Sequence, residues 1–244
     1  ANNDIKFIAF DQLTSNINCT NTVVPKIVVK NNGLNTISQI NVNYTINATP
    51  DSFLWNGTLL SDTNTEISFP TLNLTRGVYS MEVTTDIPND AVSFNNSGTT
   101  TLYVNDAGTV GQINTFTNAS DALISYNEGS TASQWVRGIR TSGTMTSSGN
   151  TVYTTNISGN YPNNIKSYLV SQCYNLSTVA NPEISFAMKF DLENNFDLVY
   201  VQYSTDFGAN WSVLGTMGTN WYNSDRTPTT TGNDCANCPG AQWT

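Results

Sequence analysis

The stretch YVQYSTDFGANW, residues 200–211, contains a β-rich run that is followed by a turn. Val199, Val201 and Tyr203 occupy alternate positions, which is the spacing of a half-buried strand because successive side chains of a strand point to opposite faces. Asp, Gly and Asn then supply turn residues before Trp211 resumes an apolar strand. This stretch predicts an exposed β-hairpin, and the rest of the chain can be interpreted as the scaffold around such hairpins.

Four positions of this hairpin have the spacing S-x-D-x-G-x-x-W, namely Ser204, Asp206, Gly208 and Trp211. The spacing resembles the Asp-box turn. That resemblance implies a carboxylate that binds the amides of its own loop and an indole that covers the strand behind it. The box occurs on several unrelated β-folds, sialidases included, so it predicts a structural turn and not a glycosidase.

The amino-acid composition favours a chain of strands and turns. Asn and Thr each occur 35 times among the 244 residues, whereas charged residues make up only 11%. Thr, Val, Ile, Tyr and Phe suit pleated strands, and Asn, Gly and Asp suit the turns between them. A chain of this length can form one large β-domain or two ordinary ones. We therefore expect an all-β fold.

The charge balance and the lack of histidine exclude several classes of function. The net charge is −9, and nucleic acid is not an expected partner because its binding needs clustered Lys and Arg. The sequence has no run of about 18 apolar residues, so membrane insertion is not expected either. The absence of histidine rules out His-based catalysis and His-ligated zinc within these residues. An enzyme would have to use paired carboxylates, which nothing in the sequence indicates, so we expect no catalytic activity.

Cys235 and Cys238 form a C-x-x-C pair in a loop rich in Gly, Asn and Pro. The second C-x-x-C of an all-cysteine zinc site is missing, and the pair does not lie at a strand-to-helix junction as in thioredoxins. We expect a local disulfide in an exported protein, with free thiols as the alternative. Cys19 and Cys173 are assigned to different domains, and we expect them not to pair with each other.

The first 106 residues show seven short strands at spacings of about a dozen residues. The clearest has Ile40, Val42 and Tyr44 at alternate positions. Asn56-Gly57 predicts a two-residue hairpin turn. The pattern is typical of an Ig-like β-sandwich. The expected strands are 5–10, 23–30, 40–46, 53–60, 66–69, 79–83 and 99–104.

Residues 1–106 also resemble a known family. The stretch CTNTVVPKIVVKNNGLNTISQINVNYTI at 19–46, GVYSMEV at 77–83 and SFNNSGTTTLYV at 93–104 look like the CARDB-type Ig-like module. In that pattern an N-x-G turn follows the second strand and an Asn-Asn pair precedes the last. The resemblance implies an extracellular spacer or adhesion module that has no catalytic residues.

The pattern of strands and loops changes in residues 110–244, and we expect a β jelly-roll sandwich there. The short turn cluster at 105–108 is expected to join it tightly to the first domain. Residues 110–244 resemble the MAM-like, concanavalin-type jelly rolls of bacterial surface proteins that are secreted by the type IX route. The family pattern continues for further strands, so the jelly roll is expected to be incomplete at its C-terminus. The likeness is carried by 161–164 (YPNN), 167–169 (SYL), 171–173 (SQC), 181–186 (NPEISF), 201–214, 221–223 (WYN) and 238–244 (CPGAQWT).

Asp191, Glu193 and Asp197 lie in one polar loop with two asparagines. Hard oxygen ligands of this kind suit Ca²⁺, and MAM-like jelly rolls often carry structural calcium. The spacing is not that of an EF-hand, and an acidic loop is also commonly just solvated. Structural calcium is the one cofactor that the sequence suggests, with these three carboxylates as its candidate ligands.

Several aromatic residues of the second half could stack on sugar rings. Trp221 and Tyr222 lie among Gly, Asn and Ser and are expected to be the most exposed, with Trp135 as a further candidate. Aromatic side chains on strands are more often core residues. The polar loop after Tyr222, up to Pro239, is of the kind where recognition usually takes place.

The sequence as a whole predicts a non-catalytic adhesion or ligand-binding segment of a large secreted bacterial surface protein. Its expected partner is a glycan or a cell-surface protein, bound by the second domain while the first acts as a spacer. Two alternatives remain open. The domains could be accessory to a secreted hydrolase, such as a metalloprotease, or they could form a structural repeat of a surface fibre that self-associates.

Overall fold

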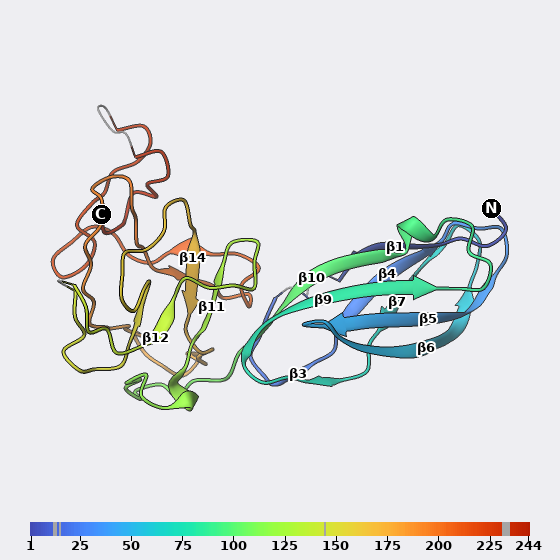
Figure 1. Cartoon of the computed structure of the whole chain (residues 1–244), viewed down its shortest axis with the longest axis horizontal. Coiled ribbons are helices and arrows are strands. Elements are labelled where there is room, and N and C mark those ends of the chain that lie inside the picture. Colours follow the sequence, from blue (N-terminus) through green and yellow to red (C-terminus); the bar gives the residue numbers. More distant parts are fainter. Residues whose placement is uncertain (12–13, 15, 144, 231–234) are drawn as a thin grey trace. The chain divides into compact units, whose positions relative to one another are not determined.

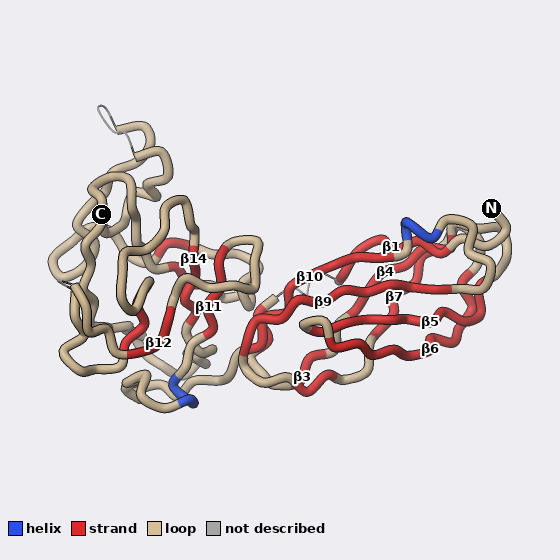
Figure 2. The backbone as a smooth tube through the Cα atoms, viewed as in Figure 1, coloured by secondary structure: helices blue, strands red, loops and turns tan. Residues whose placement is uncertain are grey.

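The computed structural model describes residues 1–11, 14, 16–143, 145–230 and 235–244, and these residues form strands and loops almost throughout (Figures 1 and 2). Helical structure in these ranges is limited to short 3-10 turns such as η2 (Ser93–Asn95) and η3 (Ala119–Asp121). Among the described residues, no helix has the length and apolar character needed to cross a membrane. The predicted all-β class is confirmed.

A five-stranded sheet forms one layer of a β-sandwich. Its order is β2-β10-β9-β5-β6, and Figure 1 shows β9 lying between β10 and β5. All neighbours pair antiparallel except β2 and β10, which are parallel. The strands are β2 (Ile17–Asn18), β10 (Ser97–Val104), β9 (Gly77–Asp86), β5 (Ile37–Ile46) and β6 (Thr49–Leu59).

The opposite layer is a three-stranded antiparallel sheet of order β1-β4-β7, accompanied by a short pair, β3 and β8. Pro25 separates β3 from β4, because a residue without an amide hydrogen cannot continue the ladder. The strands are β1 (Ile5–Phe10), β4 (Lys26–Asn31), β7 (Asn64–Ser68), β3 (Thr22–Val23) and β8 (Leu72–Asn73).

Alternate residues of both sheets point into one shared core. In β4, buried and half-buried residues alternate without exception, and in β9 the buried side chains of Met81, Val83 and Thr85 alternate with exposed ones. A one-residue slip would turn either set toward solvent, so this pattern sets the register. The fully buried members of the core are Ile5, Ile27, Val29, Ile40, Val42, Met81 and Leu102.

The hairpin turn between β5 and β6 is not where the sequence predicted it. Asn47 and Ala48 make the two-residue turn, with φ of 46° and 65°, and Ile46 pairs with Thr49 across it. Asn56-Gly57 instead lies inside β6, near the point where its register with β5 shifts. The prediction was wrong because the pairing of β5 with β6 continues past this dipeptide, with Gln39 opposite Asn56 and Ile37 opposite Leu59.

After Val104 the strands become short and occur in pairs. These pairs are β11 (Ile124–Asn127) with β14 (Ser167–Val170), β12 (Val136–Gly138) with β13 (Val152–Thr154), and β15 (Gln202–Tyr203) with β16 (Ser212–Val213). All three pairs are antiparallel. A jelly roll in this half of the chain stays a prediction.

The chain divides into two compact units by its internal contacts. The first comprises residues 1–141 and 147–179, and the second comprises 142–146 and 180–244. The predicted domain boundary at 106–110 therefore falls inside the first unit, just after the sandwich ends with β10 at Val104. The residues that follow the sandwich contact it over a continuous junction, which explains why they share a unit.

The junction inside the first unit is held covalently and by backbone hydrogen bonds. Cys19 and Cys173 form a disulfide with a Cα–Cα distance of 5.8 Å. The Gly108 amide donates to the Cys173 carbonyl at 2.7 Å, and the Cys173 amide donates to the Asp106 carbonyl at 2.9 Å. The expectation that these two cysteines do not pair was wrong, because it rested on a domain boundary that their surroundings do not follow.

Candidate functional site

The hairpin at residues 200–211 forms a closed turn. Asp206 Oδ1 accepts hydrogen bonds from the Ser204 hydroxyl at 2.7 Å and from the Asn210 amide at 2.9 Å, while its Oδ2 accepts from Asn210 Nδ2 at 2.7 Å. The Gly208 amide donates to Ser204 Oγ at 2.8 Å, and Trp211 Nε1 donates to the Gly208 carbonyl at 3.0 Å. The four residues of the S-x-D-x-G-x-x-W spacing thus all take part in one network.

These hydrogen bonds determine the charge of the turn. The side-chain amide of Asn210, its backbone N–H and the Ser204 hydroxyl lower the pKa of Asp206 to about 2. The carboxylate is therefore ionised at neutral pH and binds its donors as an anion, which makes each bond stronger than a neutral one. The turn is rigid as a result.

Three aromatic side chains of this hairpin are exposed. Tyr203 is 48%, Phe207 62% and Trp211 39% accessible to solvent. Phe207 has a positive φ angle of 57°, which residues with a side chain seldom adopt. Gly208 follows with a φ angle of 86°, which glycine adopts readily. From the sequence, Trp211 is expected to have only a structural role and Tyr203 to lie on a half-buried strand, whereas Phe207 has no expected role.

Trp221 and Tyr222, the predicted ligand-binding residues, are instead part of a core. Tyr222 is only 1% exposed, and its hydroxyl accepts from the Val201 amide at 2.9 Å and donates to the Val201 carbonyl at 3.2 Å. Trp221 is half-buried and donates from Nε1 to the Leu214 carbonyl at 3.2 Å. The prediction of exposure was wrong, because it used the polar neighbours in sequence and could not see the residues that pack on these rings.

The partner that covers these rings is Trp243. Its ring centroid lies 4.5 Å from that of Tyr222 and 5.3 Å from that of Trp221, and its Nε1 donates to the Trp221 carbonyl at 2.9 Å. Phe186 adds an edge contact to both tryptophans, at 5.6 and 6.0 Å. This cluster is the hydrophobic core of the second unit. It is a stabilising feature and offers no open stacking surface.

The other predicted ligand-binding positions are Trp135 and the loop after Tyr222. Trp135 belongs to the first unit and is half-buried, with its backbone amide bound to Ser133 Oγ at 3.0 Å. Residues 231–234 of the loop that follows Tyr222 lie outside the described residues. Cys235 and Cys238 are buried and joined by a disulfide, with a Cα–Cα distance of 5.5 Å.

The acidic loop does not bring its three carboxylates together. Asp191 and Glu193 are exposed, whereas Asp197 is half-buried and its Oδ2 accepts from the Glu193 amide at 3.2 Å. That bond closes a turn in which Asp197 N–H also donates to the Glu193 carbonyl at 2.9 Å. In the part of the chain that the structure describes, no three His, Cys, Asp or Glu residues are grouped to hold a metal ion.

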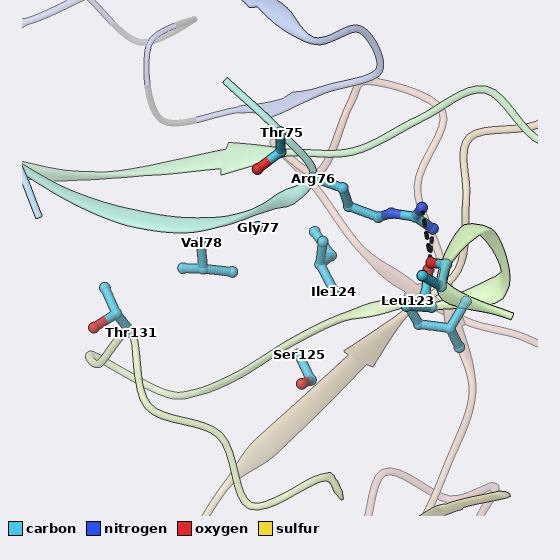
Figure 3. A pocket seen from close by; sticks show the side chains of 10 residues that line it. Thr75, Arg76, Gly77, Val78, Leu123, Ile124, Ser125 and Thr131 are labelled. Carbon is cyan, nitrogen blue, oxygen red and sulfur yellow. Dashed lines mark hydrogen bonds between the residues drawn. The ribbon is translucent and has the colours of Figure 1, made fainter. Parts of the chain in front are cut away.

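A polar pocket of about 430 Å³ lies in the first unit, beside the residues at which β9 begins (Figure 3). Arg76 reaches across it toward η3, where its guanidinium donates to the carbonyls of Ser120 at 3.1 Å and of Ala122. It also forms an ion pair with Asp106 at 2.9 Å. These partners occupy the guanidinium, so Arg76 holds η3 against the sandwich. The other lining residues include Thr75, Gly77, Val78, Leu123, Ile124, Ser125 and Thr131.

The alternation of apolar residues at 184–190 in the sequence predicts a strand, but residues 183–190 are not paired with any described strand. Ile184, Phe186, Met188 and Phe190 alternate with smaller or polar residues, and all four are exposed by more than a third. No hydrogen bond joins the backbone of residues 183–190 to any other residue that the structure describes. A segment that has the sequence of a strand but no backbone hydrogen bonds to a neighbouring strand can pair with another strand.

The comparisons with known proteins give the sandwich some structural relatives. No protein-family model matches the chain. No curated protein matches it either. Among solved structures, a domain of a candidate cell surface protein from Methanosarcina acetivorans is similar over 43% of this chain and 93% of its own length, at 19% identity and a TM-score of 0.36.

Two further structures are similar over a comparable part of the chain. One is the CARDB domain of a Pyrococcus furiosus protein in complex with di-metal ions, at 21% identity and a TM-score of 0.31, over 41% of this chain and 84% of its own. The other is a beta-glucosidase from Listeria innocua in complex with glucose, at 12% identity and a TM-score of 0.27, over 41% of this chain and 16% of its own. Likenesses at these identities and scores carry no argument about function.

Proposed function

We propose that this chain is a non-catalytic, extracellular segment of a secreted bacterial surface protein, and that it binds a glycan through its second unit. All four cysteines are joined in disulfides, which persist in oxidising compartments outside the cytosol. The MAM-like resemblance and export by the type IX route belong to the same proposal. So does the role of the Ig-like sandwich as a spacer.

The observation that carries the binding proposal is the exposure of three aromatic side chains on the Asp-box hairpin, Tyr203, Phe207 and Trp211. Large aromatic rings that are exposed on a rigid element supply contact area at a low entropic cost on binding. The turn network around Asp206 provides that rigidity. Ring faces of this kind stack on the apolar faces of sugars, and Thr205 and Ser212 lie beside them as neutral hydrogen-bonding groups.

Binding of this kind would depend little on ionic strength. The contacts are aromatic stacking and neutral hydrogen bonds, which salt does not screen. The direct test is to apply the full chain to an array of glycans at low and high salt. Binding to a defined subset of glycans at both salt concentrations supports the proposal. The absence of binding, or binding that salt abolishes, contradicts it. Accessory domains of a secreted hydrolase remain the alternative for the same surface.

A second candidate function is a structural repeat that self-associates, and the unpaired segment 183–190 favours it. Two copies of this segment can pair antiparallel about Phe186. In that register Ile184 faces Met188, and Glu183 faces Lys189, twice each. Apolar and oppositely charged cross-strand pairs both stabilise such a ladder.

The charge pairs allow a sharp test of self-association. Lys189→Glu places like charges opposite each other and should weaken a dimer, whereas the double variant Glu183→Lys with Lys189→Glu restores the pairs. Sedimentation of the three proteins should show dimer, monomer and dimer in that order. A wild-type chain that sediments as a monomer at all accessible concentrations contradicts this second candidate.

A further inference from the structure

A cluster of buried oxygen-bearing side chains lies at one end of the sandwich, where β1 begins beside η2. Asp4 precedes β1 directly and is only 2% exposed. Its Oδ2 accepts from Asn32 Nδ2 at 2.7 Å, and its Oδ1 accepts from Asn95 Nδ2 at 3.1 Å. Both donors are neutral amides, so the carboxylate is buried among polar groups that carry no compensating charge.

A second carboxylate lies next to the first. Asp90 Oδ2 accepts from Asn96 Nδ2 at 2.8 Å and from the backbone amide of Ile5 at 3.4 Å, which is the residue after Asp4. Its Oδ1 accepts from the Val92 amide at 2.9 Å. The two carboxylates therefore bind the side chains of consecutive residues, Asp4 that of Asn95 and Asp90 that of Asn96.

In the described parts of the chain, no basic side chain is paired with either carboxylate, Asp4 or Asp90, and the ion pairs that do occur involve other acids. Burying an ionised carboxylate without a cation is strongly unfavourable, even where neutral groups donate hydrogen bonds to it. The site has an excess of two negative charges.

Two buried amide oxygens of the cluster have no partner. Asn95 Oδ1 and Asn96 Oδ1 are inaccessible to solvent and accept no hydrogen bond from any residue that the structure describes. Asn96 as a whole is 3% exposed, and its amide already faces Asp90 through its nitrogen. A buried carbonyl oxygen without a donor is a rare and costly arrangement that calls for an explanation.

We propose that this cluster binds a calcium ion, with the carboxylates of Asp4 and Asp90 and the amide oxygens of Asn95 and Asn96 as ligands. Oxygens that share a Ca²⁺ ion are each about 2.3–2.6 Å from it and lie roughly 3 Å from one another. The present carboxylate-to-amide distances of 2.8 and 3.1 Å already have that size. A half-turn of each amide about χ2 exchanges its nitrogen for its oxygen and directs the two unpartnered oxygens to the ion.

The ligand set selects calcium over other common ions. It contains only hard oxygen atoms, whereas zinc sites in proteins are built mainly from cysteine and histidine. Mg²⁺ requires shorter distances of about 2.0–2.1 Å and nearly octahedral geometry, which two consecutive asparagines on a 3-10 turn do not readily supply. This inference is independent of the glycan-binding proposal, because it concerns the sandwich and not the second unit.

The proposal places calcium away from the acidic loop that the sequence suggested. It can be tested by titrating the chelator-treated full chain with CaCl₂ in a calorimeter, and with MgCl₂ in parallel. Extracellular modules bind calcium with dissociation constants of about 10⁻⁴–10⁻³ M, and we expect one site in that range with weaker Mg²⁺ binding. The melting temperature should rise with calcium, because an ion that binds only the folded state stabilises it.

Two variants distinguish the sandwich cluster from the acidic loop. Asp90→Asn removes one ligand charge at a half-buried position and should weaken calcium binding by about tenfold or more, while the calcium-free protein melts no lower than wild type. Asp191→Asn is the matched control in the acidic loop and should bind like wild type. The proposal is overturned if the wild-type chain shows neither heat nor a melting shift with calcium, or if Asp191→Asn loses binding and Asp90→Asn keeps it.

Discussion

Cys19 and Cys173 are separated by 154 positions in sequence and lie 5.8 Å apart between their Cα atoms, joined by a disulfide. Cys19 follows β2 at the edge of the five-stranded sheet, and Cys173 follows β14 in the segment beyond the sandwich. The bond closes the longest covalent loop in the chain. It also explains why residues well beyond the Ig-like sandwich belong to the same compact unit.

Removing this disulfide should destabilise the first unit strongly. A cross-link restricts the unfolded chain more as the closed loop grows, and losing one of this kind costs about 2–5 kcal/mol. We expect the variant with Cys19→Ser and Cys173→Ser to unfold at a clearly lower urea concentration. The measurement is urea unfolding of the full chain, followed by the circular dichroism of its β-structure.

The other disulfide provides the comparison. Cys235 and Cys238 are three positions apart, and the same chain-entropy relation gives only about 2 kcal/mol for their removal. Replacing both with Ser should therefore affect the second unit less than the long-range bond affects the first. Peptide mapping without reductant that recovers Cys19 and Cys173 as free thiols would refute this part of the account.

Asp206 should titrate well below an unperturbed aspartate. Its folded-state pKa of about 2 is lower than the 3.8 of an unperturbed carboxyl, so its hydrogen bonds stabilise the folded hairpin above about pH 4. That contribution is lost as the pH falls from about 4 through 2. Carboxyl chemical shifts in an NMR titration give the pKa directly. A value near 4 would mean that the turn network does not form in solution.

The buried hydroxyl of Tyr222 should contribute measurably to the stability of the second unit. In Tyr222→Phe, the amide of Val201 loses its partner while still partly covered, whereas the Val201 carbonyl keeps the Leu214 amide at 2.8 Å, and an unsatisfied buried group costs about 1–3 kcal/mol. Denaturant unfolding monitored by tryptophan fluorescence follows this unit through Trp211, Trp221 and Trp243, with Trp55 and Trp135 adding the signal of the first unit. Tyr203→Phe is the control, because Tyr203 is exposed, and it should unfold like wild type. Equal stability of the two variants would contradict the assigned core.

The strands of the sandwich could be predicted from local patterns, whereas their partners could not. The alternation at Ile40, Val42 and Tyr44 indicates a half-buried strand without knowledge of its neighbours, and the structure extends it to the full length of β5. The same reasoning indicated a strand at 184–190, where the structure has an extended but unpaired segment. An alternating pattern describes one strand, but a ladder also needs a second strand in reach.

The predictions of site residues failed where exposure and pairing depend on contacts between residues far apart in the sequence. Trp221 and Tyr222 have polar neighbours in sequence, and only the fold brings Trp243 over their rings. The pairing of Cys19 with Cys173 likewise depends on tertiary contacts across 154 positions. The Asp-box turn was predictable because all of its hydrogen bonds join residues within four positions of each other.

The central claim is that the exposed aromatic side chains of the hairpin bind the ligand. The most direct measurement compares the affinity of three full-length proteins for the glycan that the array identifies: wild type, the variant with Tyr203→Ala and Phe207→Ala, and Phe94→Ala. Phe94 is 89% exposed on the sandwich and serves as the matched aromatic control. We predict that the hairpin variant loses about tenfold or more in affinity, because truncating a central aromatic contact costs about 1.4 kcal/mol or more, while Phe94→Ala binds like wild type. A hairpin variant that keeps wild-type affinity, or a loss shared equally by Phe94→Ala, would contradict the account.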